Sequence, residues 1–170
     1  RKVSVKDLGG LALSSGMITA VVFILVAIGA AFSHTLGTAG IPEKLLGPAI
    51  ESIGQNQVAA LALIAVAFFI GCMFVDPIVV ILILVPIFKP LIESANLDPI
   101  HVGVIVTLQA AIGSATPPFG CDIFTAIAVF RRPYLEVIRG TPPFIFMLLI
   151  ATFVLILFPQ LSLWLPALGG

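Results

Sequence analysis

The sequence Gly113-Ser114-Ala115-Thr116-Pro117-Pro118-Phe119-Gly120 interrupts an otherwise apolar segment that runs from His101 to Phe130. Proline has no N–H, its ring clashes with the preceding turn, and it drives the residue before it out of helical geometry. In hydrocarbon, broken backbone is tolerated only where protein buries it or where it lines a cavity. Polar residues at such a break are typical of a ligand site in a secondary transporter. We therefore predict a discontinuous helix over 101–130 with its break at 113–120.

The composition of the whole chain indicates an integral membrane protein. Its 170 residues are 60% hydrophobic and 9% charged, whereas soluble domains carry roughly 25% charged residues. The formal net charge is zero, which gives no reason to expect nucleic acid as a partner. The chain has no glycine-rich phosphate loop, so we expect no cofactor and expect an ion gradient or another subunit to supply energy. Cys72 and Cys121 lie far apart in apolar segments, which predicts packing residues rather than a disulfide.

A second interruption separates two apolar runs, 58–70 and 78–88. It contains a glycine and an Asp-Pro pair, which are typical of a turn. Each run has about a dozen residues, or roughly 16–20 Å as a helix, which is too short to cross a hydrocarbon core of about 30 Å. We therefore predict a re-entrant helical hairpin over 58–95 with its tip at 71–77. The alternative is a single kinked span over 58–80 that is followed by an ordinary loop.

The remaining segments complete an all-helical membrane architecture. Residues 1–57 hold a first apolar span, from about residue 8 to 32, and then a mixed segment. Within the mixed segment, 41–53 has the pattern of an amphipathic helix that lies in the membrane surface. Residues 131–170 hold a basic loop and a last apolar span, from which we predict a cytoplasmic loop followed by a C-terminal helix.

The distribution of cations predicts the orientation. If the hairpin enters and leaves on one side, the N-terminus and the 131–140 loop share one face, and the links 34–57 and 89–101 share the other. The first face then holds six Lys or Arg residues and the second holds two, which marks the first as cytoplasmic. The C-terminus is then periplasmic. If 58–92 instead formed two ordinary membrane spans, the cations would divide four to four between the faces and would give no orientation. The six are Arg1, Lys2, Lys6, Arg131, Arg132 and Arg139, and the two are Lys44 and Lys89.

Two carboxylates, those of Asp76 and Asp122, lie within apolar stretches. A charge at mid-membrane costs between about 2.5 and more than 10 kcal/mol, so each is expected to pair, to bind a cation or to face water. Asp76 before Pro77 also fits a helix N-cap, and Asp122 also fits a brace of the second half-helix. Two alternatives to a transporter therefore stay open: an intramembrane enzyme that uses both aspartates, and a purely structural or assembly module.

Oxygen atoms suited to Na⁺ gather at the break. The hydroxyls of Ser114 and Thr116 and the nearby backbone carbonyls are hard ligands, and the C-terminal end of a half-helix adds negative partial charge. Half-helix N-termini near Pro77 and Pro118 carry the opposite charge and would attract a substrate carboxylate. We therefore predict that one break serves both the ion and the substrate.

Three runs of sequence together resemble the large (M) membrane subunit of the tripartite ATP-independent periplasmic (TRAP) transporter family. The resemblance covers about residues 14–166 and corresponds to the C-terminal half of that subunit, so we expect the chain to be part of a larger protein. The runs are GCMFVDPIVVILILVPIFKPL (71–91), DPIHVGVIVTLQAAIGSATPPFGCDIF (98–124) and FPQLSLWLP (158–166).

The resemblance implies a Na⁺-coupled importer of organic acids, such as a C4-dicarboxylate, in the bacterial inner membrane. It implies an elevator-type transporter in which this chain is the second of two inverted repeats. The implied partners are a small (Q) membrane subunit, a periplasmic substrate-binding protein, the N-terminal half of the same M subunit, a small organic acid and the lipid bilayer.

The resemblance also implies site residues and no catalytic ones. Thr116 is the first choice as a side-chain ligand. The chain departs from the family pattern at four positions: Cys72 is inserted, Gln109 and Asp122 stand where Asn is common, and Phe119 replaces a frequent Val. By motif, the Na⁺ site would comprise Asp76, Gly71, Gly113, Ser114, Ala115 and Thr116, and the substrate-binding residues would be Asp76, Pro117, Pro118 and Gly120.

Overall fold

The computed structural model describes residues 5–168, and within that range the chain is all-helical, as the sequence predicts. Arg1 and Lys2, two of the cations used to predict the orientation, lie outside the described residues. The helices in the described range are α1 (Val5–Thr38), α2 (Ile41–Ile53), α3 (Gln57–Phe74), α4 (Pro77–Ser94), α5 (Pro99–Ser114), α6 (Cys121–Phe130), α7 (Tyr134–Arg139), α8 (Pro142–Leu157) and α9 (Gln160–Leu168).

Three of the described helices, α1, α3 and α4, are long and apolar enough to cross a membrane. A fourth span results if α8 and α9, which meet at a bend of 71°, are counted as one. Helices α5 and α6 are shorter apolar helices on either side of the predicted break. Large apolar side chains are exposed along α1 and α8, as expected for helices that face lipid.

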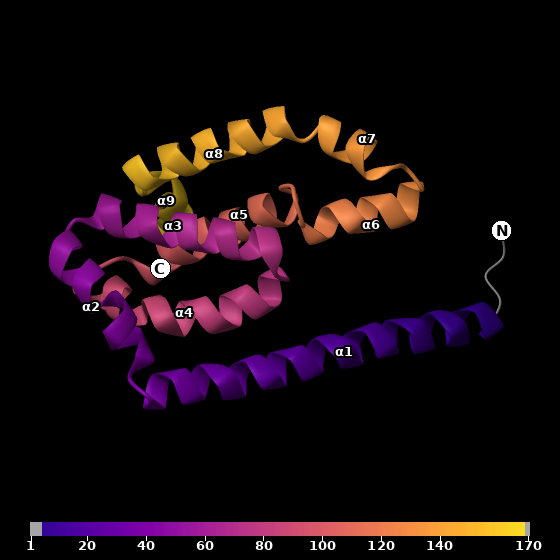
Figure 1. The fold of residues 1–170 in the computed structure, drawn as a ribbon, viewed down its shortest axis with the longest axis horizontal. Coiled ribbons are helices and arrows are strands. Elements are labelled where there is room, and N and C mark those ends of the chain that lie inside the picture. Colours follow the sequence, from indigo (N-terminus) through magenta and orange to yellow (C-terminus); the bar gives the residue numbers. More distant parts are fainter. Residues whose placement is uncertain (1–4, 169–170) are drawn as a thin grey trace.

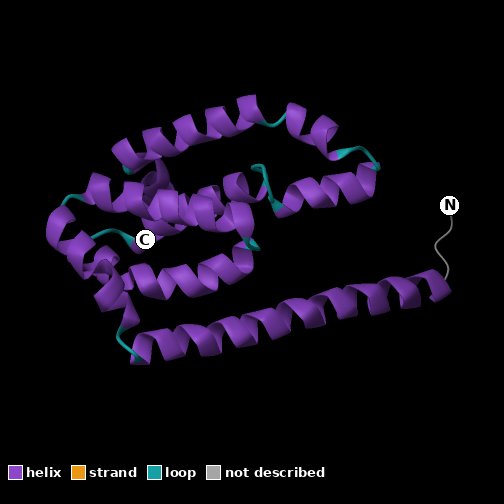
Figure 2. Cartoon of the chain, in the orientation of Figure 1, coloured by secondary structure: helices purple, strands orange, loops and turns teal. Residues whose placement is uncertain are grey.

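Helices α3, α4 and α5 form the centre of the molecule (Figure 1). The first two run antiparallel as a hairpin, α5 packs against α3, and α8 covers α5 and α3 on the other side. Helix α1 packs along α4 and extends well beyond the end of the hairpin (Figure 1). Figure 2 shows that short loops connect these elements.

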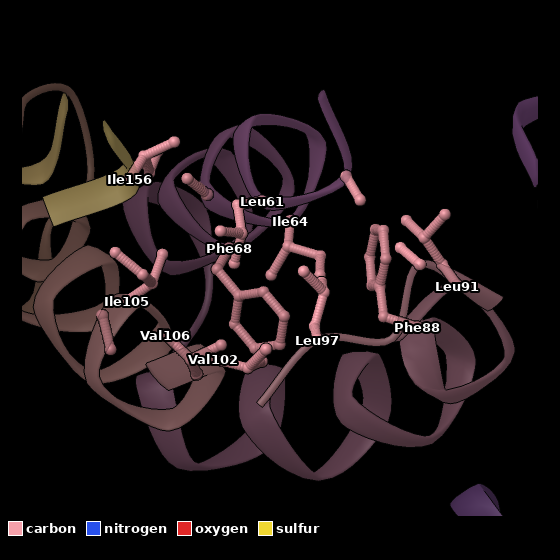
Figure 3. Packing of buried hydrophobic residues seen from close by; sticks show 14 of the residues in the cluster. Leu61, Ile64, Phe68, Phe88, Leu91, Leu97, Val102, Ile105, Val106 and Ile156 are labelled. Carbon is pink, nitrogen blue, oxygen red and sulfur yellow. The ribbon is translucent and has the colours of Figure 1, made fainter. Parts of the chain in front are cut away.

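The apolar core lies between the hairpin and α5 (Figure 3). The rings of Phe68 in α3 and Phe88 in α4 meet with their centroids 6.1 Å apart. Ile64 in α3 and Ile105 in α5 are fully buried in this core. Because lipid tails are as apolar as these side chains, helix association here depends on close van der Waals packing. The core residues labelled in Figure 3 are Leu61, Ile64, Phe68, Phe88, Leu91, Leu97, Val102, Ile105, Val106 and Ile156.

The turn of the hairpin is shorter than the predicted 71–77, and its arms are longer. Helix α3 continues to Phe74 and α4 begins at Pro77, so only Val75 and Asp76 lie between them. Each arm has 18 residues, which corresponds to about 27 Å of helix. The prediction that the arms are too short to cross a bilayer was therefore wrong.

Gly71 explains the error, because it serves packing rather than chain reversal. It lies inside α3, and a Cβ atom at this position would come within 2.8 Å of Val80 Cγ1 in α4. The glycine lets the two arms approach closely without ending the helix. Pro86 and Pro90 likewise lie inside α4 and do not end it at 88.

The tip of the hairpin lies beside the α5–α6 break, part-way along α1 (Figure 1). Phe74 at the end of α3 contacts Phe119 in the break, with ring centroids 5.7 Å apart. The N-terminal end of α1 and α7 lie at one end of the molecule, beyond the tip, and α2 lies at the other end (Figure 1). Whether the hairpin re-enters the membrane on one side therefore stays a prediction.

Three further boundaries can be compared with the prediction. Helix α2 covers the range predicted for the amphipathic helix. Helix α1 continues through 33–38, which we expected in the mixed segment, and ends before Gly40, whose φ of 62° is left-handed. Residues 134–139, predicted as loop, form α7.

A second glycine holds α5 against α3. A Cβ atom at Gly113 would lie 2.7 Å from both Cys72 Cβ and the carbonyl oxygen of Phe69. Cys72 is buried at this contact, which agrees with its predicted role in packing. Small residues at a crossing allow two membrane helices to approach closely. Gly113 is therefore a packing residue at the end of α5, and the hairpin is fixed against the helix that precedes the break.

This contact predicts that Gly113→Ala destabilises the protein. The added methyl must displace the backbone of α3, and overpacking of this kind costs about 1–3 kcal/mol. We expect the melting temperature of the full-length protein in detergent to fall by several degrees. Gly103→Ala in the same helix is the matched control, because nothing lies within 4 Å of a Cβ atom there. An equal effect of the two substitutions would contradict the packing role.

Candidate functional site

The break between the half-helices covers residues 115–120. Helix α5 ends at Ser114 and α6 begins at Cys121, so the break is narrower than the predicted 113–120. The Pro117–Pro118 peptide bond within it is cis. The predicted discontinuous helix is thus present, with its two halves joined by a loop that has no repetitive structure.

Consecutive prolines leave carbonyl oxygens at the end of α5 without their helical donors. In an α-helix the carbonyl of residue i accepts from the N–H of residue i+4. For Gly113 and Ser114 these residues are Pro117 and Pro118, which have no N–H. The Gly113 carbonyl accepts from the N–H of Thr116 instead, at 3.0 Å. The Ser114 carbonyl has no helical donor, so the negative end of α5 presents an oxygen that can bind a cation.

Thr116 is the best-placed side-chain ligand in the break. Its side chain is buried, and Oγ1 donates its proton to the carbonyl of Ile112 at 2.6 Å. Because the proton is used in this way, the lone pairs of the hydroxyl oxygen remain available to a cation. The observed geometry therefore suits the role that the sequence predicts for Thr116.

Gly120 allows the loop to fold back over the end of α5. A Cβ atom there would overlap the carbonyl oxygen of Ser114 and lie 2.8 Å from that of Thr116. The N–H of Gly120 also donates to the Thr116 carbonyl at 3.1 Å. Two backbone oxygens of the break are thus packed against a residue that has no side chain.

Asp122 joins the two half-helices across the break. Its Oδ2 atom accepts a hydrogen bond from the Ser114 hydroxyl at 2.6 Å. Ser114 is the last residue of α5 and is buried, whereas Asp122 lies in the first turn of α6 and is exposed. Hydrogen bonds to ionised groups are stronger than those between neutral groups. The brace that the sequence suggested for Asp122 is therefore present, with Ser114 as its partner.

At the hairpin tip, Asp76 is the N-cap of α4. Its Oδ1 atom accepts from the N–H of Ile78 at 2.9 Å, and its side chain is exposed. The contact between Phe74 and Phe119 brings the tip to the break. Gly71 is the least suited of the predicted ligands, because it lies within α3 and its carbonyl accepts from Val75 N–H at 2.9 Å.

Tyr134 is a residue of this region that sequence reasoning missed. Its hydroxyl donates to the carbonyl of Pro118 at 2.9 Å, and its ring contacts Phe124 with centroids 6.5 Å apart. The sequence gives one signal in retrospect, which is a single tyrosine in the short basic segment after α6. Nothing in that segment identifies Pro118 as its partner.

Two buried hydrogen bonds that attach α5 to the C-terminal helices were missed as well. Gln109 Nε2 donates to Thr152 Oγ1 at 2.7 Å, which links α5 to α8. His101 Nδ1 lies 2.6 Å from Ser162 Oγ in α9, and its Nε2 has no hydrogen-bond partner in the described part of the chain. His101 stands at the end of an apolar segment of the sequence, where an interfacial position is the usual expectation, but it is buried. The pairs are 43 and 61 residues apart, so only the tertiary structure reveals them.

The two cavities next to these polar pairs lie away from the break. One of about 190 Å³ is lined by Gln109 and Thr152, and one of about 430 Å³ is lined by His101 and Asp98. The break itself lies at an exposed edge formed by Phe119 and the start of α6. A closed substrate site at the break therefore needs a second wall from outside the described residues.

Comparison with known proteins connects this geometry to one family. The family model described as tripartite ATP-independent periplasmic transporter, DctM component, matches residues 1–161. The ectoine TRAP transporter large permease protein of Halomonas elongata is 59% identical over 99% of this chain and 39% of its own length. The ectoine/5-hydroxyectoine permease protein of Ruegeria pomeroyi is 61% identical over 99% of this chain and 39% of its own length.

A more distant relative carries a different printed substrate. The C4-dicarboxylate TRAP transporter large permease protein of Pseudomonas aeruginosa is 33% identical over 91% of this chain and 36% of its own length. The chain thus spans about two fifths of the length of these curated relatives. No solved structure matches it.

The hydrogen bond between Ser114 and Asp122 predicts the behaviour of two variants. Asp122→Ala removes the acceptor, and loss of a hydrogen bond to a charged group costs about 1.5–3 kcal/mol. We expect amide hydrogen exchange in the break to accelerate at least about tenfold. Asp122→Asn keeps an oxygen acceptor without the charge and should exchange at a rate between those of the Ala variant and the wild type. Identical exchange in the Ala variant and the wild type would show that the brace does not order the break.

Proposed function

Because this chain belongs to the DctM component family of the tripartite ATP-independent periplasmic transporters, we propose that it is part of a permease that imports a small solute bearing a carboxylate. The relatives with 59% and 61% identity are named for ectoine, and the one named for C4-dicarboxylates has 33%. We therefore propose ectoine or a closely similar compound as the substrate, ahead of the C4-dicarboxylate that the sequence suggested. Ectoine also carries a carboxylate.

The charges at the break support this order of substrates. Helices α4 and α6 direct their N-termini, with positive partial charge, toward the region of the tip and the break. Asp76 caps the first of these helices, and Asp122 lies in the first turn of the second. Their negative charges oppose the attraction of the helix ends for a dianion. A solute with one carboxylate and one cationic group, such as ectoine, suits this pattern better.

The observation that carries the proposed Na⁺ coupling is a pair of oxygens that accept no helical hydrogen bond beside a proline-interrupted helix end. The Ser114 carbonyl lacks a helical donor, and the buried Thr116 hydroxyl has donated its proton to Ile112. Oxygen ligands of this kind suit a hard cation, and the negative end of α5 adds to the attraction. Ala115 and Gly113 contribute further backbone oxygens, and Asp76 supplies negative charge from the hairpin tip.

The proposed mechanism couples ion and substrate through one loop. Na⁺ binds at the end of α5 and orders the break, and Pro117, Pro118 and Gly120 then shape the surface on which the carboxylate of the substrate docks. Release of the ion loosens the same loop and lowers the affinity for the substrate. Because the coupling is reciprocal, bound substrate retains the ion to the same degree.

The remaining parts of the proposal follow from family membership. The missing second wall of the site would come from the N-terminal half of the same permease, as an inverted repeat. A small membrane subunit and a periplasmic binding protein would be the partners, in a bacterial inner membrane. With the hairpin re-entrant, the C-terminus would be periplasmic, and the site would cross the membrane by an elevator-type motion.

The two alternatives have less support. An intramembrane enzyme would need Asp76 and Asp122 to act as a pair, yet each makes a separate hydrogen bond, one to Ile78 and one to Ser114. The relatives are also named as transporter permeases. A purely structural module gains nothing from an interrupted helix with a buried hydroxyl and an unpaired carbonyl.

The ion proposal predicts that Thr116→Ala weakens Na⁺ dependence. The control is Thr107→Ala in α5. The hydroxyls of Thr116 and Thr107 each donate to the carbonyl four residues earlier, at 2.6 Å and 2.8 Å respectively. The measurement is Na⁺-driven uptake of labelled ectoine into proteoliposomes that contain the full-length permease, its small subunit and its binding protein. We expect the Na⁺ concentration for half-maximal uptake to rise about tenfold or more in Thr116→Ala and in Asp76→Asn, and to stay unchanged in Thr107→Ala.

Undiminished Na⁺-driven uptake in both Thr116→Ala and Asp76→Asn would move the ion site away from the tip and the break. Loss of assembly in Thr116→Ala alone, judged by gel filtration with the small subunit, would mean that the hydroxyl serves folding.

The substrate proposal predicts selective competition in the same proteoliposomes. Unlabelled ectoine should abolish the uptake of labelled ectoine, and succinate at the same concentration should leave most of it. Because the binding protein also selects substrate, the assay is repeated with Asp122→Asn. This variant has one negative charge fewer and should become more sensitive to succinate. Full competition by succinate in the wild type would favour a dicarboxylate.

A further inference from the structure

We propose that Tyr134 is a positioning residue of the ion site: its hydroxyl holds the Pro118 carbonyl and, through it, the shape of the break. This inference rests on the proposed function of the break as a Na⁺ site. The hydroxyl donates to the Pro118 oxygen at 2.9 Å. Tyr134 does not belong to either half-helix, because it begins α7.

The local chain geometry brings Tyr134 back to the break. Helix α6 ends at Phe130, and Arg131 reverses the chain with a left-handed φ of 52°. The ring of Tyr134 then packs on Phe124 in α6. This contact fixes the direction of the ring, so the hydroxyl reaches along α6 to the loop before it. The tether therefore has a rigid base on the second half-helix.

The break needs such a tether because it has few donors of its own. Pro117 and Pro118 have none, and the N–H groups of Thr116 and Gly120 serve the carbonyls of Gly113 and Thr116. The hydrogen bond between Ser114 and Asp122 fixes the two ends of the loop. Tyr134 fixes its middle. A loop that is ordered before the ion arrives binds it more tightly, because binding then costs less conformational entropy.

The tether also engages one oxygen of the break. The Tyr134 hydroxyl occupies one of the two lone pairs of the Pro118 carbonyl, so we assign the ion to other oxygens. The carbonyls at the end of α5 and the Thr116 hydroxyl remain. Movement of the basic segment that follows α6 would release the Pro118 carbonyl, so this segment and the ion site are physically connected.

The test is ²²Na⁺ binding to the full-length permease with its small subunit in lipid nanodiscs. Tyr134→Phe removes the hydroxyl and keeps the ring on Phe124, and loss of one hydrogen bond to a carbonyl should raise the Na⁺ dissociation constant about three- to tenfold. Thr125→Val is the matched control, because its hydroxyl also donates to a backbone carbonyl, that of Cys121 at 3.1 Å, but within α6. We expect Thr125→Val to bind Na⁺ like the wild type.

Two further measurements separate positioning from general stability and from failure of the ion site. The melting temperature without Na⁺ should be equal in Tyr134→Phe and Thr125→Val. A lower value or lost assembly in Tyr134→Phe alone would overturn the proposal, since the hydroxyl would then serve folding. A wild-type dissociation constant in Tyr134→Phe, with weakened binding in Thr116→Ala, would overturn this inference and leave the ion site standing. Unchanged binding in both variants would overturn the ion site itself.

Discussion

The structure depends on one constraint, which is that backbone polar groups in hydrocarbon need partners within the protein. Pro117 and Pro118 remove two donors at the point where α5 would otherwise continue into α6. Two side-chain hydroxyls donate to backbone carbonyls near the break, Thr116 to Ile112 and Tyr134 to Pro118. The side chains of Ser114 and Asp122 join the two ends of the break. These bonds leave the Ser114 carbonyl without a helical donor. The same deficit that would destabilise a plain membrane helix leaves this oxygen available to the cation of the proposed function.

Close approach of helices is the second condition, and glycine provides it at three contacts. Gly71 brings the hairpin arms together, Gly113 brings α3 onto α5, and Gly120 brings the loop onto the end of α5. Gly71 lies near the hairpin tip, and Gly113 and Gly120 lie on either side of the break. Their contacts therefore bring the tip beside the interrupted helix. Packing of small residues thus creates the neighbourhood of the site, and the polar groups then define its chemistry.

Much of this arrangement could be predicted from the sequence. Pro-Pro and Asp-Pro identify the interruptions, because proline acts through local covalent geometry that needs no tertiary context. Glycine was harder to interpret, because a glycine in a sequence can indicate either a chain reversal or a close contact between helices. The sequence alone does not distinguish these roles for Gly71 and Gly113. The partners of Gln109, His101 and Tyr134 could not be predicted, because each lies on a different element of the fold at a separation of 16 to 61 residues.

Under the proposed function, ion and substrate would be coupled through electrostatics as well as through loop order. The end of α5 carries negative partial charge and the start of α6 carries positive partial charge, and only the residues 115–120 separate them. A cation at the first end and a carboxylate at the second would also attract each other directly, over a short distance in a medium of low dielectric constant. Asp122 bridges the two ends and holds them at a fixed separation. In this proposal, an interrupted helix with a braced gap would therefore favour the binding of both species together.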